Sequence, residues 1–498
     1  MNSIWLNKNN KINYKFNKLD KNIKTKVCII GGGITGISTA YELTKRNIDF
    51  VLLEKDNIAC KTTSKTTAKI TSQHGLIYNY LINSYGIEFA KEYLNANEEA
   101  IRNIESIIKE ENIDCDFERQ DSYVLTNEDK HVIDIKAEVG AVNRISSNIA
   151  QLVVGDKLPL TYKCGIKFKN QASFNVIKYI NGLLNVINKD NIYENSNVYK
   201  IAKKKGKYNV YSNNKMIECD FVVLATKYPI KDIPGFYFLK MYQETSYAIA
   251  VKPNDKKKFD GMYITEDNPT ISLRWTKYNG EDILLVIGNN NKTGENISLK
   301  DKYKLLENTA KSIYPNCEVI YRRNTEDTIS IDKFAYIGKF SCFEKNILVA
   351  TGFNKWGMTT SNIASRIIVD KIQGKNNKYE KIYSSTRLKP LKNCKEMFNM
   401  VKTSVNSLFL NKLKVKNVDK VELKNGTVYK ENGNIIGIYI DENGKVYKVK
   451  PVCKHLGCLL KFNELDNTWD CPCHGSRYDY KGNVIYGPSS RNLDIYKR

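Results

Sequence analysis

Long hydrophobic runs are absent from the 498-residue sequence. No uninterrupted apolar stretch reaches the roughly 20 residues that a membrane-spanning helix needs. The opening segment, from Met1 to Lys8, also lacks the apolar core of a secretory signal peptide. These absences argue against a transmembrane segment, and we expect a soluble, cytoplasmic protein.

The sequence also lacks a compact basic block, although positive charge predominates. It contains 78 Lys and Arg against 54 Asp and Glu, a formal net charge of +24. Such a balance can indicate a nucleic-acid or membrane-surface partner. Lys is instead spread along the whole chain together with Asn and Ile, and no nucleic-acid-binding motif accompanies it. We therefore expect no nucleic-acid partner, whereas an acidic redox partner or an anionic substrate remains compatible with the charge.

Histidine is scarce, which makes its positions informative. The chain has only four histidines, and two of them lie near the C-terminal end beside cysteines. Two Cys/His pairs of this kind can converge on one metal centre, with thiolate and imidazole ligands. The two boxes read Cys453-Lys-His455-Leu-Gly-Cys458 and Cys471-Pro-Cys473-His474-Gly-Ser476.

These boxes resemble the loops of Rieske proteins, in which two thiolates hold one iron of a 2Fe-2S cluster and two neutral imidazoles hold the other. The resemblance implies that Cys453 and Cys471 are the thiolate ligands and that His455 and His474 are the imidazole ligands. Neutral ligands raise the reduction potential to roughly −150 to +300 mV. A structural zinc site uses the same residue types and is the alternative. It explains neither the additional cysteines nor the Gly-Ser-x-Tyr sequence that follows.

Further positions match the high-potential branch of the Rieske family. Cys458 and Cys473 match a disulfide that ties the two cluster loops together in that branch. Ser476 and Tyr478 match hydroxyl groups that donate hydrogen bonds to a bridging sulfide and to a cysteine sulfur, and such donors stabilise the reduced cluster. The chain has 12 cysteines. We expect those outside the boxes to be free thiols, because they show no motif spacing.

A dinucleotide-binding motif lies near the N-terminus. The apolar segment 27–30 predicts a strand that runs into Gly31-Gly-Gly33-Ile-Thr-Gly36, a G-x-G-x-x-G pattern. A helix-compatible stretch and a second predicted strand follow, and that strand ends at Glu54. The glycines permit a tight turn and close approach of a pyrophosphate to the helix N-terminus, while the carboxylate accepts the ribose hydroxyls. Together these features predict a Rossmann unit, which an incidental glycine-rich turn would not explain.

Segments farther along the chain resemble the glycine/D-amino-acid oxidase family, and this favours FAD over NAD. The resemblance covers about residues 20 to 385 and includes 62–69, which covers the flavin in that family, and 347–359, a strand, turn and helix. The N-terminus of that helix faces the flavin and stabilises its anionic reduced form. Besides the motif glycines and Glu54, the resemblance places at the cofactor Thr63, Ser64, Val198, Ala225, Thr226, Gly352, Phe353, Trp356, Gly357, Met358 and Thr359.

Some positions depart from that family. After Ala225 and Thr226 the chain continues with Lys227, where relatives often have Gly or His. No cysteine stands at the position where some relatives link the flavin covalently, so we expect non-covalent FAD. The segment 326–338 lacks the usual Pro, and substrate contacts are therefore not transferred from the family there.

We expect several domains, because 498 residues exceed the size at which one hydrophobic core is usual. The predicted fold is an α/β Rossmann-type FAD-binding fold with an α+β substrate domain, followed by a small all-β Rieske domain whose hairpins are indicated by Asn-Gly turns. The predicted parts are an N-terminal extension at 1–25, an FAD-dependent oxidoreductase at 26–385 with a substrate-binding part at about 235–325, a helical linker at 386–417 and the Rieske domain at 418–498.

The two implied cofactors predict the reaction. Reduced FAD carries two electrons and the cluster accepts one, so we expect hydride transfer from an amine or amino acid to FAD and then two single-electron transfers through the cluster. A one-electron carrier protein or a quinone-like acceptor would receive them. Arg274 is a candidate clamp for a substrate carboxylate, since a guanidinium binds one bidentately; a surface Arg paired with a neighbouring acid is the other interpretation. Tyr247 and Lys355 are weaker candidates.

Two other functions stay open at this point. In the first, electrons run from a reduced partner through the cluster to FAD, and the protein reduces its substrate. In the second, the protein is a redox-responsive binding protein in which the oxidation state of the cluster or of the disulfide governs partner affinity without turnover.

Overall fold

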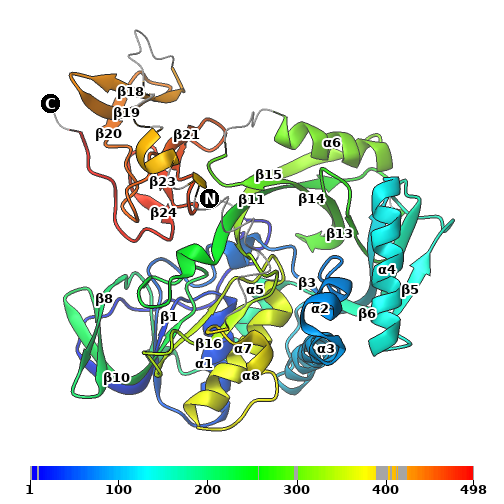
Figure 1. The fold of residues 1–498 in the computed structure, drawn as a ribbon, viewed down its shortest axis with the longest axis horizontal. Coiled ribbons are helices and arrows are strands. Elements are labelled where there is room, and N and C mark those ends of the chain that lie inside the picture. The colour runs from blue at the N-terminus through cyan, green and yellow to red at the C-terminus, as the bar shows by residue number, and fades with distance from the viewer. Residues whose placement is uncertain are drawn as a thin grey trace.

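The structure, a computed structural model, consists of two large sheets with their helices and a smaller β body at the C-terminal end, which lies at the upper left of Figure 1. The described residues are 3–7, 10–255, 257–295, 301–387, 402–403, 406–410, 412, 415 and 423–496.

The first sheet carries the dinucleotide motif. Its strands are β1 (Ile23–Ile30), β2 (Phe50–Leu53), β7 (Ile192–Tyr193), β8 (Val198–Lys204), β9 (Lys207–Ser212), β10 (Lys215–Leu224), β16 (Tyr336–Lys339) and β17 (Ile347–Thr351). They run in the order β16-β17-β10-β1-β2-β7, and β9 and β8 extend the sheet from β10. The pairs from β17 to β7 along this path are parallel. Strands β2 and β17 are buried along their whole length, as expected for parallel strands covered on both faces.

Helices cover this sheet. They are α1 (Ile34–Lys45), α5 (Val176–Val186), α7 (Gly357–Ile372) and α8 (Glu380–Tyr383). Helix α1 packs against α5 and α7, and α5 is capped by Asn175, whose side chain accepts hydrogen bonds from two backbone N–H groups of its first turn. Because α1 follows β1 and α7 follows β17, and both strands run parallel to β10, the N-termini of α1 and α7 lie at the same edge of the sheet.

In the described part of the chain, the second sheet has nine strands. Its strands are β3 (Lys69–Ile70), β4 (Glu118–Thr126), β5 (Ala150–Val153), β6 (Cys164–Ser173), β11 (Met241–Lys252), β12 (Met262–Thr265), β13 (Ile271–Tyr278), β14 (Glu281–Lys292) and β15 (Glu318–Ser330). The order is β15-β11-β14-β13-β12-β4-β6-β3, with β5 beside β6. The sheet extends beyond the predicted segment 235–325, because β12 pairs in parallel with β4. Pairing across such a sequence distance leaves no local pattern.

The remaining helices lie mainly against the second sheet and beside α7. They are α2 (Tyr78–Tyr85), α3 (Ile87–Glu110), α4 (Asp129–Ile145) and α6 (Lys302–Ile313), together with short turns η1 (Thr62–Lys65), η2 (Lys189–Asn191) and η3 (Tyr237–Leu239). Helix α3 buries Ala96, Ala100, Ile104 and Ile107, a spacing of three and four residues that gives one apolar face. Helix α6 packs on β11 and β14.

The C-terminal body contains two small antiparallel sheets. Their strands are β18 (Gly426–Glu431), β19 (Asn434–Ile440) and β20 (Val446–Val449), and then β21 (Lys461–Asn463), β22 (Thr468–Asp470), β23 (Arg477–Asp479) and β24 (Val484–Tyr486). Trp469 and Tyr478 are fully buried in the core of this body. The predicted fold class, an α/β part followed by a small all-β domain, is confirmed.

The two segments predicted to flank the FAD-binding part differ in how much of them is described. Within the predicted extension at 1–25, Trp5 is only 1% exposed and its indole Nε1 donates to the carbonyl of Thr66 over 2.8 Å. Strand β1 already begins inside that extension, at Ile23. Most of the linker predicted at 386–417 lies outside the described residues. Its described part includes one helical turn, η5 (Asn406–Leu410).

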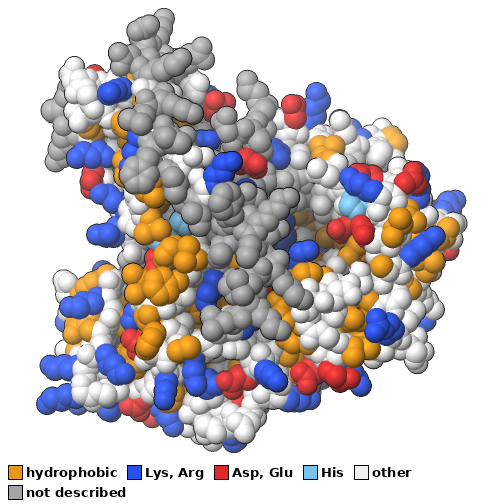
Figure 2. Space-filling view, viewed as in Figure 1, with side chains coloured by type: hydrophobic (Ala, Val, Ile, Leu, Met, Phe, Trp, Pro, Cys, Tyr) orange, Lys and Arg blue, Asp and Glu red, His pale blue; other side chains and the backbone are white. Residues whose placement is uncertain are grey.

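The surface carries charge of both signs. On the face drawn in Figure 2, Lys and Arg side chains are distributed around the outline with Asp and Glu between them. Among the helices of the described ranges, none combines the length and the apolar composition that crossing a membrane requires.

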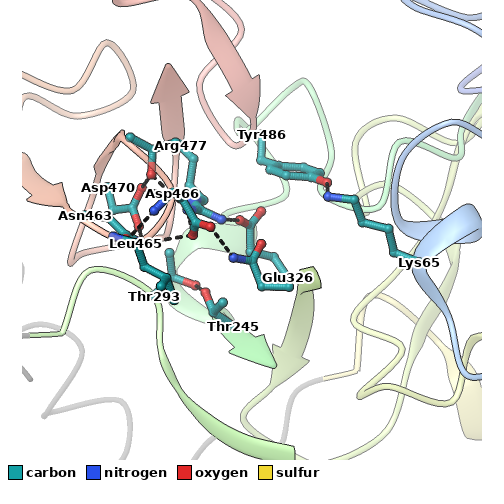
Figure 3. Close-up of polar contacts among 12 residues, drawn as sticks. Lys65, Thr245, Thr293, Glu326, Asn463, Leu465, Asp466, Asp470, Arg477 and Tyr486 are labelled. Carbon is teal, nitrogen blue, oxygen red and sulfur yellow. Dashed lines mark hydrogen bonds and ion pairs between the residues drawn. The ribbon is translucent and has the colours of Figure 1, made fainter. Parts of the chain in front are cut away.

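A buried ion-pair network joins the C-terminal body to the second sheet (Figure 3). Arg477 of β23 donates to Glu326 of β15 over 2.6 Å, to Asp466 over 2.6 Å and to Asp470 over 2.9 Å. The side chain of Arg477 is 3% exposed and that of Glu326 is fully buried. Burial raises the pKa of Glu326, while its attraction to Arg477 works in the opposite direction. The ammonium of Lys227 lies 3.9 Å from the other oxygen of Glu326, so Arg477 is the nearer of two cationic partners.

We expect Arg477→Met to destabilise the protein by on the order of 3–5 kcal/mol, because Asp470 would lose its cation and Glu326 would keep only the more distant Lys227. Urea unfolding followed separately through flavin fluorescence and through the visible circular dichroism of the cluster measures the effect in each part. Arg322→Met is the matched control, since Arg322 is half exposed and forms a surface pair with Glu307. That variant should lose no more than about 1 kcal/mol. Equal stability of the two variants would contradict the importance of the network.

Candidate functional site

A cavity of about 380 Å³ lies at the sheet edge where α1 and α7 begin. Its walls come from three parts of the chain. The first sheet contributes the turn after β1 and the end of β2, and the second sheet contributes residues of β11, β13, β14 and β15. Residues 484–490 of the C-terminal body close it. Ligands of α/β proteins bind at this position, outside the carboxyl ends of parallel strands.

The motif glycines make the turn between β1 and α1 possible. Gly31 has a φ of +109°, and a Cβ there would lie 2.6 Å from the carbonyl oxygen of Ala225. A Cβ on Gly36 would lie 1.9 Å from the carbonyl oxygen of Gly31. The N-cap of α1, Gly33, provides no side-chain hydrogen bond to the helix. The N–H of Ile34 donates to the hydroxyl of Thr63 over 3.0 Å, and Ile34 and Thr35 at the start of α1 line the cavity, where a helix N-terminus suits a pyrophosphate.

Glu54 follows β2 and faces the same cavity. Its Oε2 accepts from the backbone N–H of Gly32 over 2.7 Å, and its Oε1 accepts from that of Asp56 over 2.9 Å. Burial raises the pKa of this carboxyl, although both backbone donors act to lower it. Two fixed donors hold the carboxylate in one orientation, which suits recognition of ribose hydroxyls.

The structure brings most of the predicted cofactor residues together. Gly31, Gly33, Glu54, Thr63, Val198, Ala225, Thr226, Gly352, Phe353, Trp356, Gly357 and Met358 all line the cavity. Three predicted residues do not line it, and each has a contact of its own. Gly36 packs against the turn, Ser64 donates to the carbonyl of Lys61 over 3.0 Å, and Thr359 donates to the carbonyl of Thr71 over 3.4 Å.

Arg274 does not line this cavity. Its guanidinium donates to the carbonyls of Thr67 and Phe174, the latter over 3.0 Å, and its carbon lies 5.5 Å from the ring centroid of Trp5. Burial lowers the pKa of Arg274 to about 9. The side chain thus connects β13 to the backbone at Thr67 and Phe174. This geometry does not support its predicted role as a carboxylate clamp. Tyr247 is also absent from the cavity wall.

Two cations that the sequence analysis missed do face the cavity. Arg323 of β15 donates to the carbonyl of Thr66 over 2.9 Å, and burial lowers its pKa to about 10. Lys69, at the start of β3, donates to the carbonyl of Tyr263 over 2.8 Å and to the hydroxyl of Ser272 over 2.7 Å. Burial lowers the pKa of Lys69 to about 7. Lys355, a weaker candidate, lines the cavity and pairs with Glu244.

A signal for this wall was present in the sequence. Arg323, Thr325 and Asp327 alternate along β15, and all three line the cavity. Polar residues repeated with a period of two on a strand mark a polar face. Burial raises the pKa of Asp327. The cavity wall therefore carries both cationic and acidic groups on one strand.

The two cysteine and histidine boxes fold into loops with the same backbone pattern. In the first loop, Cys453 N–H donates to the Cys458 carbonyl and Gly457 N–H donates to the Cys453 carbonyl, each over 2.9 Å. In the second, Cys471 N–H donates to the Ser476 carbonyl and Gly475 N–H donates to the Cys471 carbonyl, again over 2.9 Å. Both glycines have positive φ, which L side chains rarely adopt. Their position four residues after each cysteine explains their place in both boxes.

Four potential ligand groups converge between these loops. The thiol of Cys471 hydrogen-bonds to the sulfur of Cys453 and lowers the pKa of Cys453. The rings of His455 and His474 lie 5.0 Å apart between centroids, and burial lowers the pKa of His474 to about 3. Both Nδ1 atoms are buried without a hydrogen-bond partner in the described part of the chain. Two adjacent sulfurs and two unpartnered imidazole nitrogens fit a Rieske cluster.

The other residues of the boxes surround these ligands. Cys458 and Cys473 form a disulfide, as the resemblance implied. The hydroxyl of Tyr478 lies 3.4 Å from the sulfur of Cys453 and accepts from the N–H of Lys454. The hydroxyl of Ser476 accepts from the N–H of Ser489 over 3.0 Å, which leaves its proton free to be donated. Apart from the boxes, the cysteines of the described chain are free thiols.

The cluster loops lie directly against the FAD side of the molecule. A Cβ on Gly475 would lie 2.3 Å from the Cβ of Gln243, and one on Gly294 would lie 2.7 Å from the nitrogen of Pro472. Lys65, from the cavity wall, donates to the hydroxyl of Tyr486 over 3.1 Å (Figure 3). Only glycine leaves room at these positions for the side chain of Gln243 and for the backbone of Pro472.

The comparisons with known proteins identify the class. The model of the FAD dependent oxidoreductase family matches residues 26–371, and that of the Rieske [2Fe-2S] domain matches residues 411–497. The chain therefore belongs to the FAD-dependent oxidoreductase family and carries a C-terminal Rieske domain. It is an FAD-dependent enzyme, and it binds FAD and a 2Fe-2S cluster, which decides against zinc at the second site.

Individual relatives agree with this class. A Bacillus subtilis (strain 168) protein described as a Rieske 2Fe-2S iron-sulfur protein, YhfW, is 36% identical over 482 residues, which cover 96% of this chain and 94% of the relative. Glycine oxidase from Geobacillus kaustophilus has a TM-score of 0.60 at 15% identity, over 73% of this chain and 99% of its own. L-amino acid deaminase from Proteus vulgaris has a TM-score of 0.60 at 14% identity, over 75% of this chain and 99% of its own. At these identities the two structures show the fold alone.

We expect Glu54→Ala to weaken FAD binding by about tenfold or more, because a hydrogen bond to a charged group contributes about 1.5–3 kcal/mol. The ratio of FAD to protein after dialysis and the Kd on reconstitution measure this effect. Iron and acid-labile sulfide should stay at the wild-type level, because Glu54 and the cluster ligands belong to different domains. Glu218→Ala, on β10 and paired with the exposed Lys24, is the control and should retain FAD. Joint loss of iron and FAD in Glu54→Ala would argue against separate sites.

Proposed function

We propose that the protein oxidises an amine or an amino acid at FAD and passes the electrons singly through its own cluster to a one-electron carrier protein or a quinone-like acceptor. The supporting observation is that residues 484–490 of the Rieske domain line the same cavity as Gly31 and Glu54. A domain that forms part of the cavity wall receives electrons without an encounter between two molecules. The presence of both domains in one chain therefore supports an electron relay between them.

Bound FAD supplies a two-electron acceptor, and the cluster supplies one-electron steps. The N-termini of α1 and α7 both face the cavity, and their dipoles favour negative charge on a ligand there. Lys65 and Lys227 add positive charge beside Tyr486, with the ammonium of Lys227 4.9 Å from that ring centroid. These groups bind the cofactor and stabilise it when it is reduced and anionic.

The charged groups on the substrate side suit an amino acid. Arg323 and Lys69 provide cations for a carboxylate, and Asp327 provides an acid near an amine. All three lie in strands of the second sheet, which holds them rigidly. Two fold neighbours, glycine oxidase and L-amino acid deaminase, are named for amino-acid substrates. We assign the carboxylate contact to Arg323 and Lys69, because both line the cavity and Arg274 does not.

Anaerobic titration with a panel of amines and amino acids tests the direction of the reaction. Bleaching of the flavin by one of them is the expected result. Bleaching only by a reduced carrier protein would favour the reductase, in which electrons enter through the cluster. If neither a small molecule nor a reduced carrier protein bleaches the flavin, and a partner binds with an affinity that depends on redox state, the result would favour a binding protein.

We expect His455→Ala to leave flavin reduction by substrate nearly unchanged and to stop steady-state transfer to a one-electron acceptor. Hydride transfer needs only substrate and flavin in contact, whereas reoxidation needs a one-electron route out of the cavity. Stopped-flow spectroscopy separates the two steps. His131→Ala is the control, because His131 lies on α4 and pairs with Asp134 away from both centres. Wild-type steady-state turnover of His455→Ala with the one-electron acceptor would contradict the proposed relay.

We expect carboxylate ligands to bind more weakly as the pH rises through about 7, the value to which burial lowers the pKa of Lys69. The sign follows because the ammonium form, present below that pH, attracts the carboxylate, and the neutral amine does not. Binding of acetate or benzoate, followed by the change in the flavin spectrum, gives the profile. Lys69→Met should flatten it, while Lys277→Met, exposed on β13, should not. Identical profiles in wild type and Lys69→Met would refute the assignment.

A further inference from the structure

One predicted iron ligand makes a hydrogen bond across the domain boundary. The Nε2 atom of His455 lies 2.7 Å from Oδ2 of Asp232, which belongs to the FAD-binding part of the chain. The side chain of His455 is 5% exposed and that of Asp232 is 26% exposed. The carboxylate is therefore shielded from water on the side that faces the cluster.

The two nitrogens of His455 have different surroundings, and this decides the direction of the hydrogen bond. Nδ1 is buried and has no hydrogen-bond partner in the described residues, so it is the nitrogen that is available to iron. Nε2 then carries the proton and donates to Asp232. A carboxylate that accepts from a ligand imidazole fixes the ring orientation and makes the ligand more electron-rich.

Asp232 stands at the end of a short segment that begins in the FAD cavity. Residues 225–228 and Ile230 line that cavity, and Asp232 follows two residues later. The backbone N–H of Phe236 donates to the carbonyl of Asp232 over 2.7 Å, which closes the turn. Phe238, just beyond, places its ring edge against both histidine rings, at 6.1 Å from His455 and 5.9 Å from His474 between centroids. One segment thus touches both redox sites.

The lysines next to Asp232 and His455 in the sequence form ion pairs with other acids. Lys231 pairs with Glu344 at 3.3 Å, and Lys454, beside His455, pairs with Asp494 at 2.6 Å. The second oxygen of Asp232 is buried without a hydrogen-bond partner in the described chain. The negative charge therefore acts mainly on the imidazole and on the iron that it holds.

We propose that Asp232 is a positioning residue that holds the histidine edge of the cluster toward the FAD cavity and lowers the cluster's reduction potential. This deepens the proposed relay. In the transfer step one electron leaves reduced FAD, and the iron held by the histidines goes from ferric to ferrous. A fixed negative charge beside that iron opposes the added electron, so the reduced cluster gives it up more readily to the external acceptor. Segment 225–232 is the protein path between the two sites.

The experiment is a redox titration of the cluster in the full-length holoprotein, followed by electron paramagnetic resonance with chemical mediators. Asp232→Asn keeps the shape of the side chain and removes its charge. We expect the equilibrium for one-electron reduction of the cluster to shift at least tenfold toward the reduced form, which corresponds to 59 mV more positive potential. Asp494→Asn is the matched control, because it removes the same charge beside the same loop without touching a ligand.

A shift in Asp232→Asn no larger than that in Asp494→Asn overturns the proposal. If Asp232→Asn loses iron, Asp232→Glu must restore both the iron content and the wild-type potential, and failure of that rescue also overturns it. The rate of electron transfer after light-driven reduction of the flavin is the second readout, and it should change in Asp232→Asn only. None of these measurements needs the substrate. The relay would fail instead if no amine or amino acid bleached the flavin while the potential still shifted.

Discussion

The buried ion pair between Arg477 and Glu326 is the contact on which the arrangement of the two redox parts depends. Arg477 lies three residues after His474, so its position is tied to the second cluster loop. Glu326 is fully buried in β15, the strand that also presents Arg323 and Asp327 to the cavity. A charge in such a place is stable only with its partner. The pair therefore links the cluster loop to the strand that lines the cavity with Arg323 and Asp327.

Close backbone packing follows from this link. Gly475 and Gly294 bring the second cluster loop against β11 and the end of β14, with no room for a side chain. Residues 484–490 then close the FAD cavity, and His455 meets Asp232 on the other side. Each of these contacts joins residues far apart in the sequence. The positions of the two cofactor sites are thus a property of the interface between the domains.

Much of this could be predicted from the sequence, because the cofactors impose local patterns. The glycines at 31, 33 and 36 are required by one turn, and the two cysteine and histidine boxes fold as two loops with the same hydrogen bonds. The contacts between domains leave no such pattern. Asp232 and Glu326 look like ordinary polar residues until the fold brings them to His455 and Arg477. The extent of the second sheet was missed for the same reason, since β4 and β12 pair at long range.

Arg274 shows where reasoning from residue type ends. A guanidinium binds a carboxylate bidentately, but the donors of Arg274 go to two backbone carbonyls and the residue does not line the cavity. Arg323 also donates to two backbone carbonyls, but it stands on a strand whose alternate residues are polar and line the cavity. The alternation of polar residues along the strand predicts the ligand-binding face better than residue type does, because it indicates which face is exposed to a ligand.

The proposed relay requires electron flow from FAD to the cluster. Neutral imidazole ligands place Rieske potentials at roughly −150 to +300 mV, and the hydroxyls of Ser476 and Tyr478 beside the cluster act in the same direction by stabilising its reduced form. Transfer from a reduced flavin to such a centre is favourable, but a centre that is too oxidising would retain the electron. The carboxylate of Asp232 offsets part of this tendency at the histidine-bound iron. In the proposed relay the cluster would accept an electron from within the chain and still release it to an external acceptor, which a relay between a two-electron and a one-electron reaction requires.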